Sequence, residues 1–370
     1  MSLRVALLGN SFARHAQLPA LRWARDNGAP HEVVALAGHD LEKARATAAD
    51  WGIPTATDDW TSLFASDATP FDLVIVSTPT DLHAPMVRAA LESGAAVLCE
   101  KPFAMDGDEA RDLTERARGK LALIDHQTRW SPWRRAFKAA IAEGIVGTPW
   151  AGRVQMRIAS LPRLAAPMTW WYDEVRGGGI LGALGSHMLD GVVDQFGRRF
   201  EEVTARLTTV IQDRPDAEGA SVPVSADEEA WLHCVMDDGL PLTVETSIVA
   251  FGCERDAGGG NLLELRGSVG TLRLEGETEL VFIPHGEAAR ELAVEPLPTC
   301  REYGMGSTGM FPRCLPTYLR DALAAIGAGW TEVDGAATFE SAVHVMDVMD
   351  AARTSHREGR RVHVRRSEIG

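Results

Sequence analysis

The first third of the chain alternates short apolar runs with amphipathic segments. The apolar runs that we expect to be strands are residues 4–8, 31–37, 73–77, 95–99 and 121–125. The helical patterns between them lie near residues 17–27, 41–51, 83–93 and 107–118. Glycines and prolines follow several of these patterns, as they do at helix ends. A repeated order of strand and helix predicts right-handed βαβ units and a parallel sheet.

The pattern changes near residue 151, where strands follow one another with few helices between them. The expected strands are residues 154–158, 203–212, 230–236, 242–250, 262–266, 271–274 and 280–283. The polar segments 213–229 and 254–261 are expected to be connections, and helical patterns return at 317–327 and 336–358. Strands in succession with few helices predict a largely antiparallel sheet.

The length of 370 residues exceeds one ordinary core, so we expect two domains. We place the first at residues 1–126 and the second at 127–370, and leave open whether the C-terminal helices pack back on the first. The predicted fold class is an α/β Rossmann domain followed by an α+β domain with a large, mostly antiparallel open sheet.

The composition bears on which partners the protein binds and on the cell compartment in which it works. The formal net charge of -15 is spread along the chain, which disfavours nucleic acid and anionic membrane surfaces as partners. The five cysteines are far apart and lack a C-x-x-C spacing, so we expect no disulfide framework and no metal site. No apolar run reaches membrane-spanning length. We therefore expect a cytoplasmic protein without a membrane partner.

The turn after the first expected strand stands where a dinucleotide-binding G-x-G-x-x-G motif would begin. Gly9 supplies the tight turn, while Ser11 and Arg14 take the second and third glycine positions, with Phe12 and Ala13 between them. A small side chain at Ser11 still allows a pyrophosphate to approach the backbone and the helix amides. An ordinary strand-to-helix turn is the alternative.

The end of the second expected strand bears on the choice between NAD and NADP. Gly38 stands where an acidic residue would bind the ribose 2′-hydroxyl of NAD. His39 is a candidate neighbour of the adenine or of a 2′-phosphate, and the alternative is an exposed residue at a helix entry. Asp40 is expected to cap the helix that follows. The cofactor is therefore NAD or NADP, with a lean toward NADP.

Lys101 follows the apolar run 95–99 and lies between Glu100 and Pro102. The carboxyl ends of parallel strands face the ligand, and proline bars the preceding residue from helical geometry. Lys101 is therefore a candidate catalytic group held on a stiff turn, with Glu100 beside the cofactor. A surface Glu-Lys pair is the alternative.

The turn after the third expected strand also belongs at the predicted cofactor edge. Ser77, Thr78 and Pro79 end that strand, and His83 lies at the start of the following helix. Because this turn stands at a strand's carboxyl end, we assign all four residues to the cofactor site. A role in beginning the helix is the alternative.

A second group of candidate site residues follows three consecutive glycines at 177–179. Ala183, His187 and Asp190 have the spacing of one helical face, with His187 as a catalytic candidate and Asp190 as a substrate contact. A buried structural histidine is the alternative. Trp171 and Tyr172 precede the glycines and are expected either to wall a substrate pocket or to lie in the core.

Together these residues resemble the Gfo/Idh/MocA family of oxidoreductases. The resemblance runs through Gly9–Arg14, Ser77–Pro79, Glu100–Pro102, Arg129–Pro132 and Gly177–Asp190. It implies a nicotinamide cofactor, a sugar, cyclitol or polyol substrate, homodimers or homotetramers, and catalytic roles for Lys101 and His187. Arg129 is assigned to the substrate site. The family usually has an aspartate where this chain has Ala183, which puts the usual polyol assignment in doubt.

The expected function is hydride transfer between NAD(P) and a small hydroxylated substrate. One alternative is a catalytically impaired nucleotide-binding sensor or regulatory protein, which the missing carboxylate at Ala183 favours. Another is an NAD-dependent glycosidase on the same scaffold. Net turnover of NAD(P)H separates the dehydrogenase from both. An uncovered face of the second sheet would also favour association into a homo-oligomer.

Overall fold

A computed structural model describes residues 2–65, 70–158, 165–250, 260–297, 300–303 and 310–366. The chain forms two compact units, Met1–Trp130 with Leu297–Ala342, and Ser131–Pro296 with Val343–Gly370. Each unit is described separately below. The predicted domain boundary after residue 126 stays a prediction.

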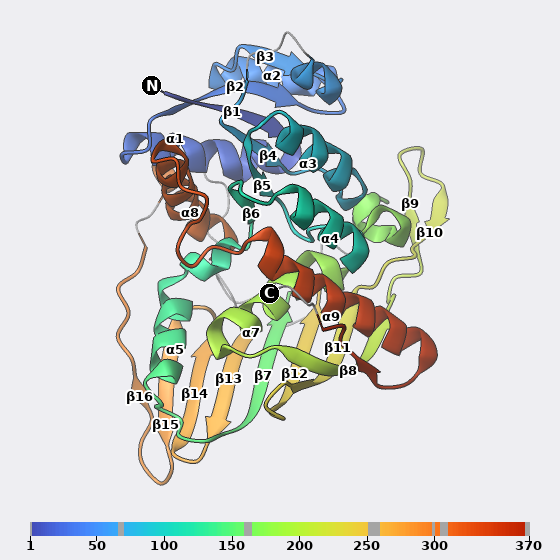
Figure 1. The fold of residues 1–370 in the computed structure, drawn as a ribbon. Helices are drawn as coiled ribbons and strands as arrows, with labels where there is room; N and C mark the ends of the chain where they lie inside the picture. The colour runs from blue at the N-terminus through green and yellow to red at the C-terminus, as the bar shows by residue number, and fades with distance from the viewer. Residues whose placement is uncertain are drawn as a thin grey trace. The chain divides into compact units, whose positions relative to one another are not determined.

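The first unit contains a six-stranded parallel sheet in the order β3-β2-β1-β4-β5-β6 (Figure 1). Its strands are β1 (Leu3–Leu8), β2 (His31–Ala37), β3 (Thr55–Thr57), β4 (Leu73–Val76), β5 (Ala96–Cys99) and β6 (Ala122–Ile124). Strand β4 is buried along its whole length, as expected for a strand covered on both faces. The order is that of dinucleotide-binding sheets, and it reverses direction between β1 and β4.

Helices connect these strands and flank the sheet. They are η1 (Ala13–Gln17), α1 (Leu18–Asp26), α2 (Leu41–Trp51), η2 (Trp60–Phe64), η3 (Thr80–Leu82), α3 (His83–Glu92), α4 (Gly107–Arg116), η4 (Gln127–Trp130), η8 (Arg301–Tyr303) and α8 (Met310–Gly327). Helix α8 returns from late in the chain and lies beside α1 (Figure 1). The Tyr318 hydroxyl donates to the Ile124 carbonyl oxygen at 2.8 Å, which ties α8 to the end of β6.

The second unit contains a nine-stranded sheet in the order β16-β15-β14-β13-β7-β12-β11-β8-β17. Its strands are β7 (Pro149–Arg157), β8 (Phe200–Thr208), β11 (Glu229–Met236), β12 (Pro241–Ser247), β13 (Asn261–Gly267), β14 (Gly270–Glu275), β15 (Glu279–Pro284), β16 (Arg290–Glu291) and β17 (Val362–His363). All neighbours pair antiparallel except β7 and β12, which are parallel. This arrangement confirms the predicted mostly antiparallel sheet.

Helices α5 (Pro132–Ala142), α7 (Ser186–Phe196) and α9 (Phe339–Glu358) cover one face of that sheet (Figure 1). Side chains of α9 accept hydrogen bonds from β8, since the Phe200 N–H donates to His344 Nε2 at 3.0 Å and the Ala205 N–H to Ser355 Oγ at 2.9 Å. These bonds satisfy donors at a strand near the sheet edge. The short elements η5 (Trp170–Tyr172), η6 (Glu174–Arg176) and η7 (Leu181–Gly185), and the hairpin β9 (Asp213–Pro215) and β10 (Ser221–Pro223), complete this unit.

A buried ion pair joins α5 to the turn between β14 and β15. Arg134 donates to both carboxylate oxygens of Glu277, at 2.9 and 2.7 Å, and both side chains are at most 2% exposed. Glu277 has a left-handed backbone with φ of 66°, which is uncommon for a residue other than glycine. The bidentate pair therefore holds a strained turn against the helix.

Several predicted elements differ from the structure. Helix α5 is not among the predicted elements, and the hairpin of β9 and β10 lies within the predicted connection 213–229. Helix α8 begins at Met310 rather than at residue 317, and it contains Pro316, which disguised the helical pattern. In the predicted connection 254–261, residues 254–259 lie outside the described residues, and β13 begins at Asn261.

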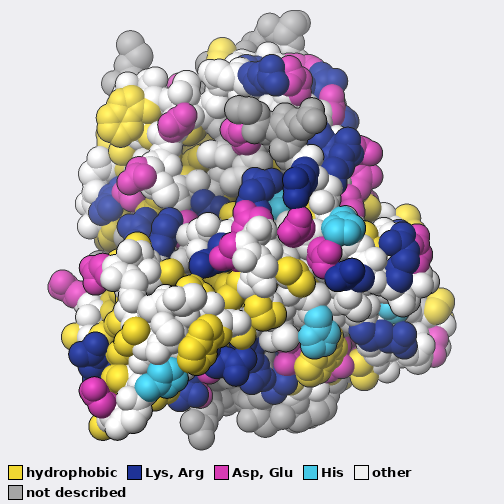
Figure 2. Space-filling view, turned by 60° about the horizontal axis from the view of Figure 1, so that its bottom comes forward, with side chains coloured by type: hydrophobic (Ala, Val, Ile, Leu, Met, Phe, Trp, Pro, Cys, Tyr) yellow, Lys and Arg dark blue, Asp and Glu magenta, His cyan; other side chains and the backbone are white. Residues whose placement is uncertain are grey.

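The described surface carries both signs of charge. On the face drawn in Figure 2, the basic and acidic side chains are interspersed with hydrophobic ones. Within the described residues, no helix is long and apolar enough to cross a membrane. The same part of the chain contains no group of three or more histidine, cysteine or acidic side chains arranged to hold a metal ion.

Candidate functional site

The turns after β1 and β4 lie side by side where the strand order of the first sheet reverses. The Ser77 N–H donates to the Leu8 carbonyl oxygen at 2.7 Å. Gly9 has φ of 116°, and a Cβ atom there would lie 2.3 Å from the Ser77 carbonyl oxygen, so only glycine fits. In open parallel sheets, ligands bind beyond the carboxyl ends of the strands at this reversal.

The helix that follows Gly9 begins immediately. The Arg14 N–H donates to the Asn10 carbonyl oxygen at 3.1 Å, and Ala13–Gln17 forms a π-helical turn before α1. The N–H groups that precede Arg14 have no acceptor within the helix, so they suit an anion such as a pyrophosphate. Buried Gln17 accepts a hydrogen bond from the Ser77 hydroxyl at 3.1 Å and joins the two turns. Ser11 and Arg14 are exposed, while Phe12 is part-buried and Ala13 is buried.

The turn after β2 presents no carboxylate that is free for a ribose. The Gly38 N–H donates to the Thr57 carbonyl oxygen at 2.9 Å, and His39 is exposed. Asp40 accepts from the Lys43 N–H at 3.0 Å and caps α2, which confirms the predicted cap. The hydrogen bond from the Lys43 ammonium at 2.8 Å, together with this backbone hydrogen bond, lowers the pKa of the Asp40 carboxyl.

Lys101 follows β5 and lies against a buried acidic neighbour. Its ammonium nitrogen is 3.5 Å from Glu100 Oε2, and the side chains of Lys101 and Glu100 are 22% and 10% exposed. The Glu100 N–H donates to the Val76 carbonyl oxygen at 2.8 Å, which fixes this turn to the end of β4. Asp125 lies at the end of the neighbouring strand β6 and is fully buried. The lysine is therefore held beside two carboxyl groups.

His83 connects the turns after β4 and β5 from the start of α3. It is buried, with Nδ1 at 3.0 Å from the Pro102 carbonyl oxygen and Nε2 at 3.0 Å from the Thr78 carbonyl oxygen. Burial lowers the pKa of the imidazole, and a neutral ring donates to one of these two oxygens at a time. The ring thus faces backbone on both sides. Its assignment as a direct cofactor contact stays a prediction.

In the second unit, a glycine turn and Asp227 begin the segment that carries His187. The Leu181 N–H donates to Asp227 Oδ2 at 2.9 Å, and the Ile180 N–H donates to the Asp227 carbonyl oxygen at 2.8 Å. A Cβ atom on Gly179 would lie 2.3 Å from Asp227 Oδ1, so glycine is required for this close approach. Burial raises the pKa of the Asp227 carboxyl to about 6.

The segment after this turn differs from the single α-helical face predicted for it. Leu181–Gly185 forms a π-helical turn that contains Ala183, and the α-helix begins only at Ser186. The π-helical turn rotates the side chains that precede α7 relative to their directions in a continuous α-helix. Such turns are frequent at functional sites. His187 and Asp190 are both 0% exposed on α7.

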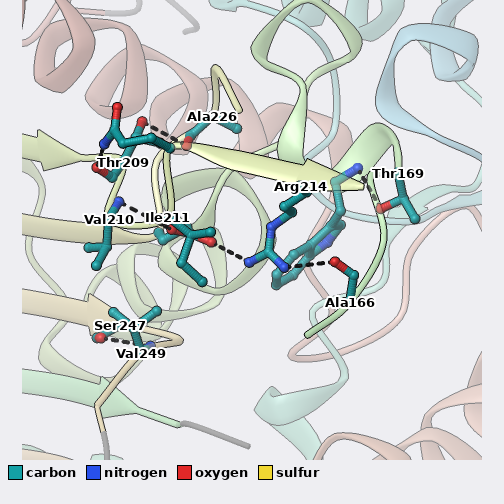
Figure 3. A network of polar contacts seen from close by, with 12 residues as sticks. Ala166, Thr169, Thr209, Val210, Ile211, Arg214, Ala226, Ser247 and Val249 are labelled. Atoms are coloured by element: carbon teal, nitrogen blue, oxygen red, sulfur yellow. Dashed lines mark hydrogen bonds and ion pairs between the residues drawn. The ribbon is translucent and has the colours of Figure 1, made fainter. Parts of the chain in front are cut away.

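Figure 3 shows a polar network of the second unit that includes Arg214, Ala166 and residues 210 and 211. Arg214 of β9 donates to Glu228 Oε1 at 2.6 Å and to the Ala166 carbonyl oxygen at 3.0 Å. Its guanidinium carbon lies 3.7 Å from the ring centroid of Tyr172, which is buried. The other Glu228 oxygen accepts the N–H groups of residues 210 and 211, at 3.1 and 2.7 Å. Tyr172 is thus a fixed residue, and Trp171 beside it is only part-buried.

The predicted site residues divide between the two units. The turns that contain Gly9, Gly38, Ser77 and Lys101 lie at one edge of the first sheet. The residues Trp171, Tyr172, His187 and Asp190 belong to the second unit. Arg129 belongs to the first unit, is 9% exposed and donates to the Ala336 carbonyl oxygen at 3.2 Å. Asp125, Arg214 and Asp227 were not predicted as site residues, because no sequence motif marks them and most of their partners are distant in the chain.

Two models of one protein family match this chain. Residues 3–124 match the family described as an oxidoreductase family with an NAD-binding Rossmann fold, and residues 134–273 match the Gfo/Idh/MocA C-terminal domain. The chain belongs to the Gfo/Idh/MocA family of oxidoreductases. The predicted family and fold class are therefore confirmed, and the first unit carries an NAD-binding Rossmann domain.

Two relatives of this Gfo/Idh/MocA protein are named dehydrogenases. It is 28% identical over 275 residues to levoglucosan dehydrogenase of Pseudarthrobacter phenanthrenivorans, covering 68% of this chain and 69% of the relative. It is also 28% identical over 285 residues to D-apiose dehydrogenase of Paraburkholderia graminis, covering 74% of this chain and 68% of the relative. The crystal structure of an oxidoreductase domain protein from Kribbella flavida matches with a TM-score of 0.85 and 26% identity. The match covers 99% of this chain and 100% of that protein.

Proposed function

We propose that this protein is an NAD(P)-dependent dehydrogenase or reductase that acts on a CH–OH group of a sugar, cyclitol or polyol. The observation that carries the proposal is Lys101, held against buried Glu100 at the carboxyl end of β5 in an NAD-binding unit. The names of the relatives, levoglucosan dehydrogenase and D-apiose dehydrogenase, support the substrate class.

The residues of the first unit fit a dinucleotide. The N–H groups at the start of the helix after Gly9 would hold the pyrophosphate, with Ser11 leaving room for its approach. Ser77, Thr78 and Pro79 would border the cofactor at the neighbouring strand end. When bound, the nicotinamide would accept or supply the hydride.

The chain's own task in the reaction is to move one proton and to hold the substrate. During oxidation, His187 or the neutral amine form of Lys101 would accept the hydroxyl proton while the hydride leaves the carbon that bears this hydroxyl. During reduction, the same group would return a proton to the new alkoxide. Trp171, Tyr172, Asp190 and Arg129 are proposed as substrate contacts. Positioned proton transfer of this kind contributes about 10²–10⁴-fold to a rate.

The cofactor preference follows from the absence of an acid at Gly38. Asp40 is engaged by Lys43, so no carboxylate of this turn is left to repel a 2′-phosphate. We therefore propose that NADPH binds at least as well as NADH. Titration of the protein's fluorescence with each cofactor tests this, and an NADH preference of about a hundredfold, roughly 2.7 kcal/mol, would contradict it.

We further propose a cytoplasmic homodimer or homotetramer assembled through the second sheet. Trp150 and Trp231 are 55% and 41% exposed on β7 and β11 of that sheet. Large exposed aromatic side chains of this kind are common at protein interfaces. Light scattering at micromolar concentration tests the assembly, and a monomer of 40.0 kDa would contradict it.

The proposed function is tested most directly with Lys101→Ala. We expect kcat toward sugar and cyclitol substrates to fall by roughly a hundredfold or more, with NAD(P)H affinity within a few-fold of the wild type. Lys138→Ala, at an exposed ion pair on α5, is the matched control and should keep full activity. Full activity of Lys101→Ala would overturn the assignment of Lys101. Cofactor binding without turnover of any such substrate by the wild type would favour the sensor role suggested by Ala183.

A further inference from the structure

Glu100 and Asp125 are neighbours across two strand ends. Cys99 pairs with Ile124 in the parallel register of β5 and β6, so the next residues on each strand, Glu100 and Asp125, also lie side by side. The Asp125 N–H donates to the Cys99 carbonyl oxygen at 2.8 Å, which continues the pairing. Partners in register direct their side chains to the same face of a sheet. The two carboxyl groups therefore face each other inside the first unit.

The hydrogen bonds of this pair are incomplete unless it holds a proton. Among the described residues, neither Glu100 Oε1 nor Asp125 Oδ2 has a hydrogen-bond donor, and both atoms are buried. The other two oxygens are engaged, since Lys101 lies 3.5 Å from Glu100 Oε2, and the Gln127 side-chain amide, once its oxygen and nitrogen are exchanged to satisfy both, donates to Asp125 Oδ1 at 3.3 Å. Buried polar atoms are rarely left without partners, because each one costs about 1–3 kcal/mol.

The charges around the two carboxyl groups also require the pair to hold a proton. Lys101 is one positive charge beside two carboxyl groups, and the ring nitrogens of His83 face backbone carbonyl oxygens. Two ionised carboxylates in contact repel each other strongly when they are buried, and such pairs share one proton. The nearby Cys99 thiol does not supply a compensating charge, and Tyr318 donates its hydroxyl to the Ile124 carbonyl oxygen.

We propose that Asp125 carries a proton at neutral pH and donates it in a hydrogen bond to Glu100, which holds the opposite oxygen of Glu100 against Lys101. This inference rests on the proposed function, because it makes Asp125 a positioning residue for the proton-transfer group of that reaction. One proton satisfies both orphaned oxygens and leaves a single carboxylate for a single ammonium group.

The direction of the Asp125 pKa agrees with this arrangement. Burial, the charge of Glu100 and a hydrogen bond with Glu100 raise the pKa of the Asp125 carboxyl well above its usual range, while Lys101 opposes the rise. The same acidic surroundings, with burial as the largest cause, raise the pKa of the Cys99 thiol. Proton loss from Asp125 would place two adjacent carboxylates beside Lys101 and disturb the position of Glu100.

The experiment compares Asp125→Asn with Asp125→Ala. Asparagine keeps a donor toward Glu100 and an acceptor toward Gln127 without needing a proton, whereas alanine removes both. Glu109→Gln is the matched control, because Glu109 accepts the Met105 N–H at 3.0 Å and lies close to Cys99 without contacting Lys101. Infrared difference spectra at pH 7.5 should show a protonated-carboxyl band that is lost in Asp125→Asn and kept in Glu109→Gln.

Activity gives the second readout. We expect Asp125→Ala to lower kcat by about tenfold at neutral pH, with NAD(P)H affinity within twofold, since a hydrogen bond to a charged group is lost. Asp125→Asn should keep the wild-type rate at neutral pH and lose the wild type's decline at high pH. Equal rates in the two variants would overturn the positioning role.

Failure of this inference is distinguishable from failure of the proposed function. The infrared band requires neither substrate nor turnover, so its persistence in Asp125→Asn would overturn the shared proton even in an active dehydrogenase. If a variant does not fold, ¹³C resonances of labelled aspartate carboxyl groups in the wild type give the same answer. One resonance should stay in its protonated form at neutral pH, and full ionisation of all of them would overturn the proposal.

Discussion

Replacing Asp227 with asparagine should remove a pH dependence of stability that arises at the start of the His187 segment. Burial raises the pKa of Asp227 from 3.8 to about 6, although its contact with the Leu181 N–H and the charge of Arg353 oppose the rise. The folded protein therefore holds this proton more tightly than the unfolded chain does. As pH rises from about 4 to 6, the unfolded chain loses its proton first, and the free energy of unfolding falls.

The magnitude follows from the two pKa values. A difference of about 2 units, at roughly 1.4 kcal/mol for each unit, gives about 3 kcal/mol. Solvent reaches part of the residue, so we expect a change of roughly 2–3 kcal/mol. Asparagine still accepts the Leu181 N–H but does not titrate. The free energy of unfolding of the wild type, minus that of Asp227→Asn, should therefore be about 2–3 kcal/mol lower at pH 7 than at pH 4.

Urea denaturation of both proteins from pH 4 to pH 8, at constant ionic strength, measures this difference. Asp40→Asn is a control of opposite sign, because the pKa of Asp40 is lowered by its hydrogen bonds to Lys43. Asp40 contributes stability above its ordinary pKa and loses it as pH falls through the lowered value. A wild-type minus Asp227→Asn difference that stays constant within about 0.5 kcal/mol, roughly the scatter of additive ΔΔG values, would refute the reasoning.

Three further predictions concern the cofactor edge, the core and the substrate site. Gly38→Asp should shift the ratio of NADH to NADPH affinity toward NADH by about tenfold or more, as fluorescence titration would show, and an unchanged ratio would contradict the placement of the ribose. Glu277→Gln should lower the free energy of unfolding by about 3–5 kcal/mol, because Arg134 would remain as a buried charge, whereas Arg118→Ala at an exposed pair should cost less than about 1 kcal/mol. Ala183→Asp should raise kcat/KM for an inositol or aldose, and unchanged values would argue against a retuned pocket.

The first unit was largely predictable because its signals are local. Strand β2 and helix α2 have the bounds predicted for them, His31–Ala37 and Leu41–Trp51. Buried parallel strands appear as uninterrupted apolar runs, and the helix has a capping aspartate before it and a left-handed glycine, Gly52, after it. The edge strand β3 was missed because three part-exposed residues carry no apolar run.

The buried charged residues of the second unit could not be predicted from the sequence, because the side chains that they contact are distant in the chain. Arg134 and Glu277 lie 143 residues apart, and no local pattern marks either as buried. Arg214 lies in a segment that reads as a polar loop, yet its side chain is 2% exposed and holds Tyr172. A buried charge is recognisable only once its partner is placed beside it.

The candidate site shows the same division between local and distant determinants. Gly9 and Lys101 were identified from the residues beside them, whereas Asp125 and Asp227 became visible only through strand register and backbone contacts. Glycine spacing alone also failed to predict the π-helical turn at Leu181–Gly185. The sequence therefore marks the groups proposed to react, and the structure adds the carboxyl groups that are proposed to position them.

Both candidate proton-transfer groups have a buried acid close to the element that carries them. Asp227 anchors the start of the segment that leads to His187, and an ionised carboxylate accepts the Leu181 N–H more strongly than a neutral one. If this anchor orients His187, activity should fall as pH drops through about 6. Asp125, in contrast, would act in its protonated form, so its loss of a proton would limit activity at high pH. The two limbs of one pH profile would then arise in different units, and each would disappear with a single Asp→Asn change that leaves the other intact.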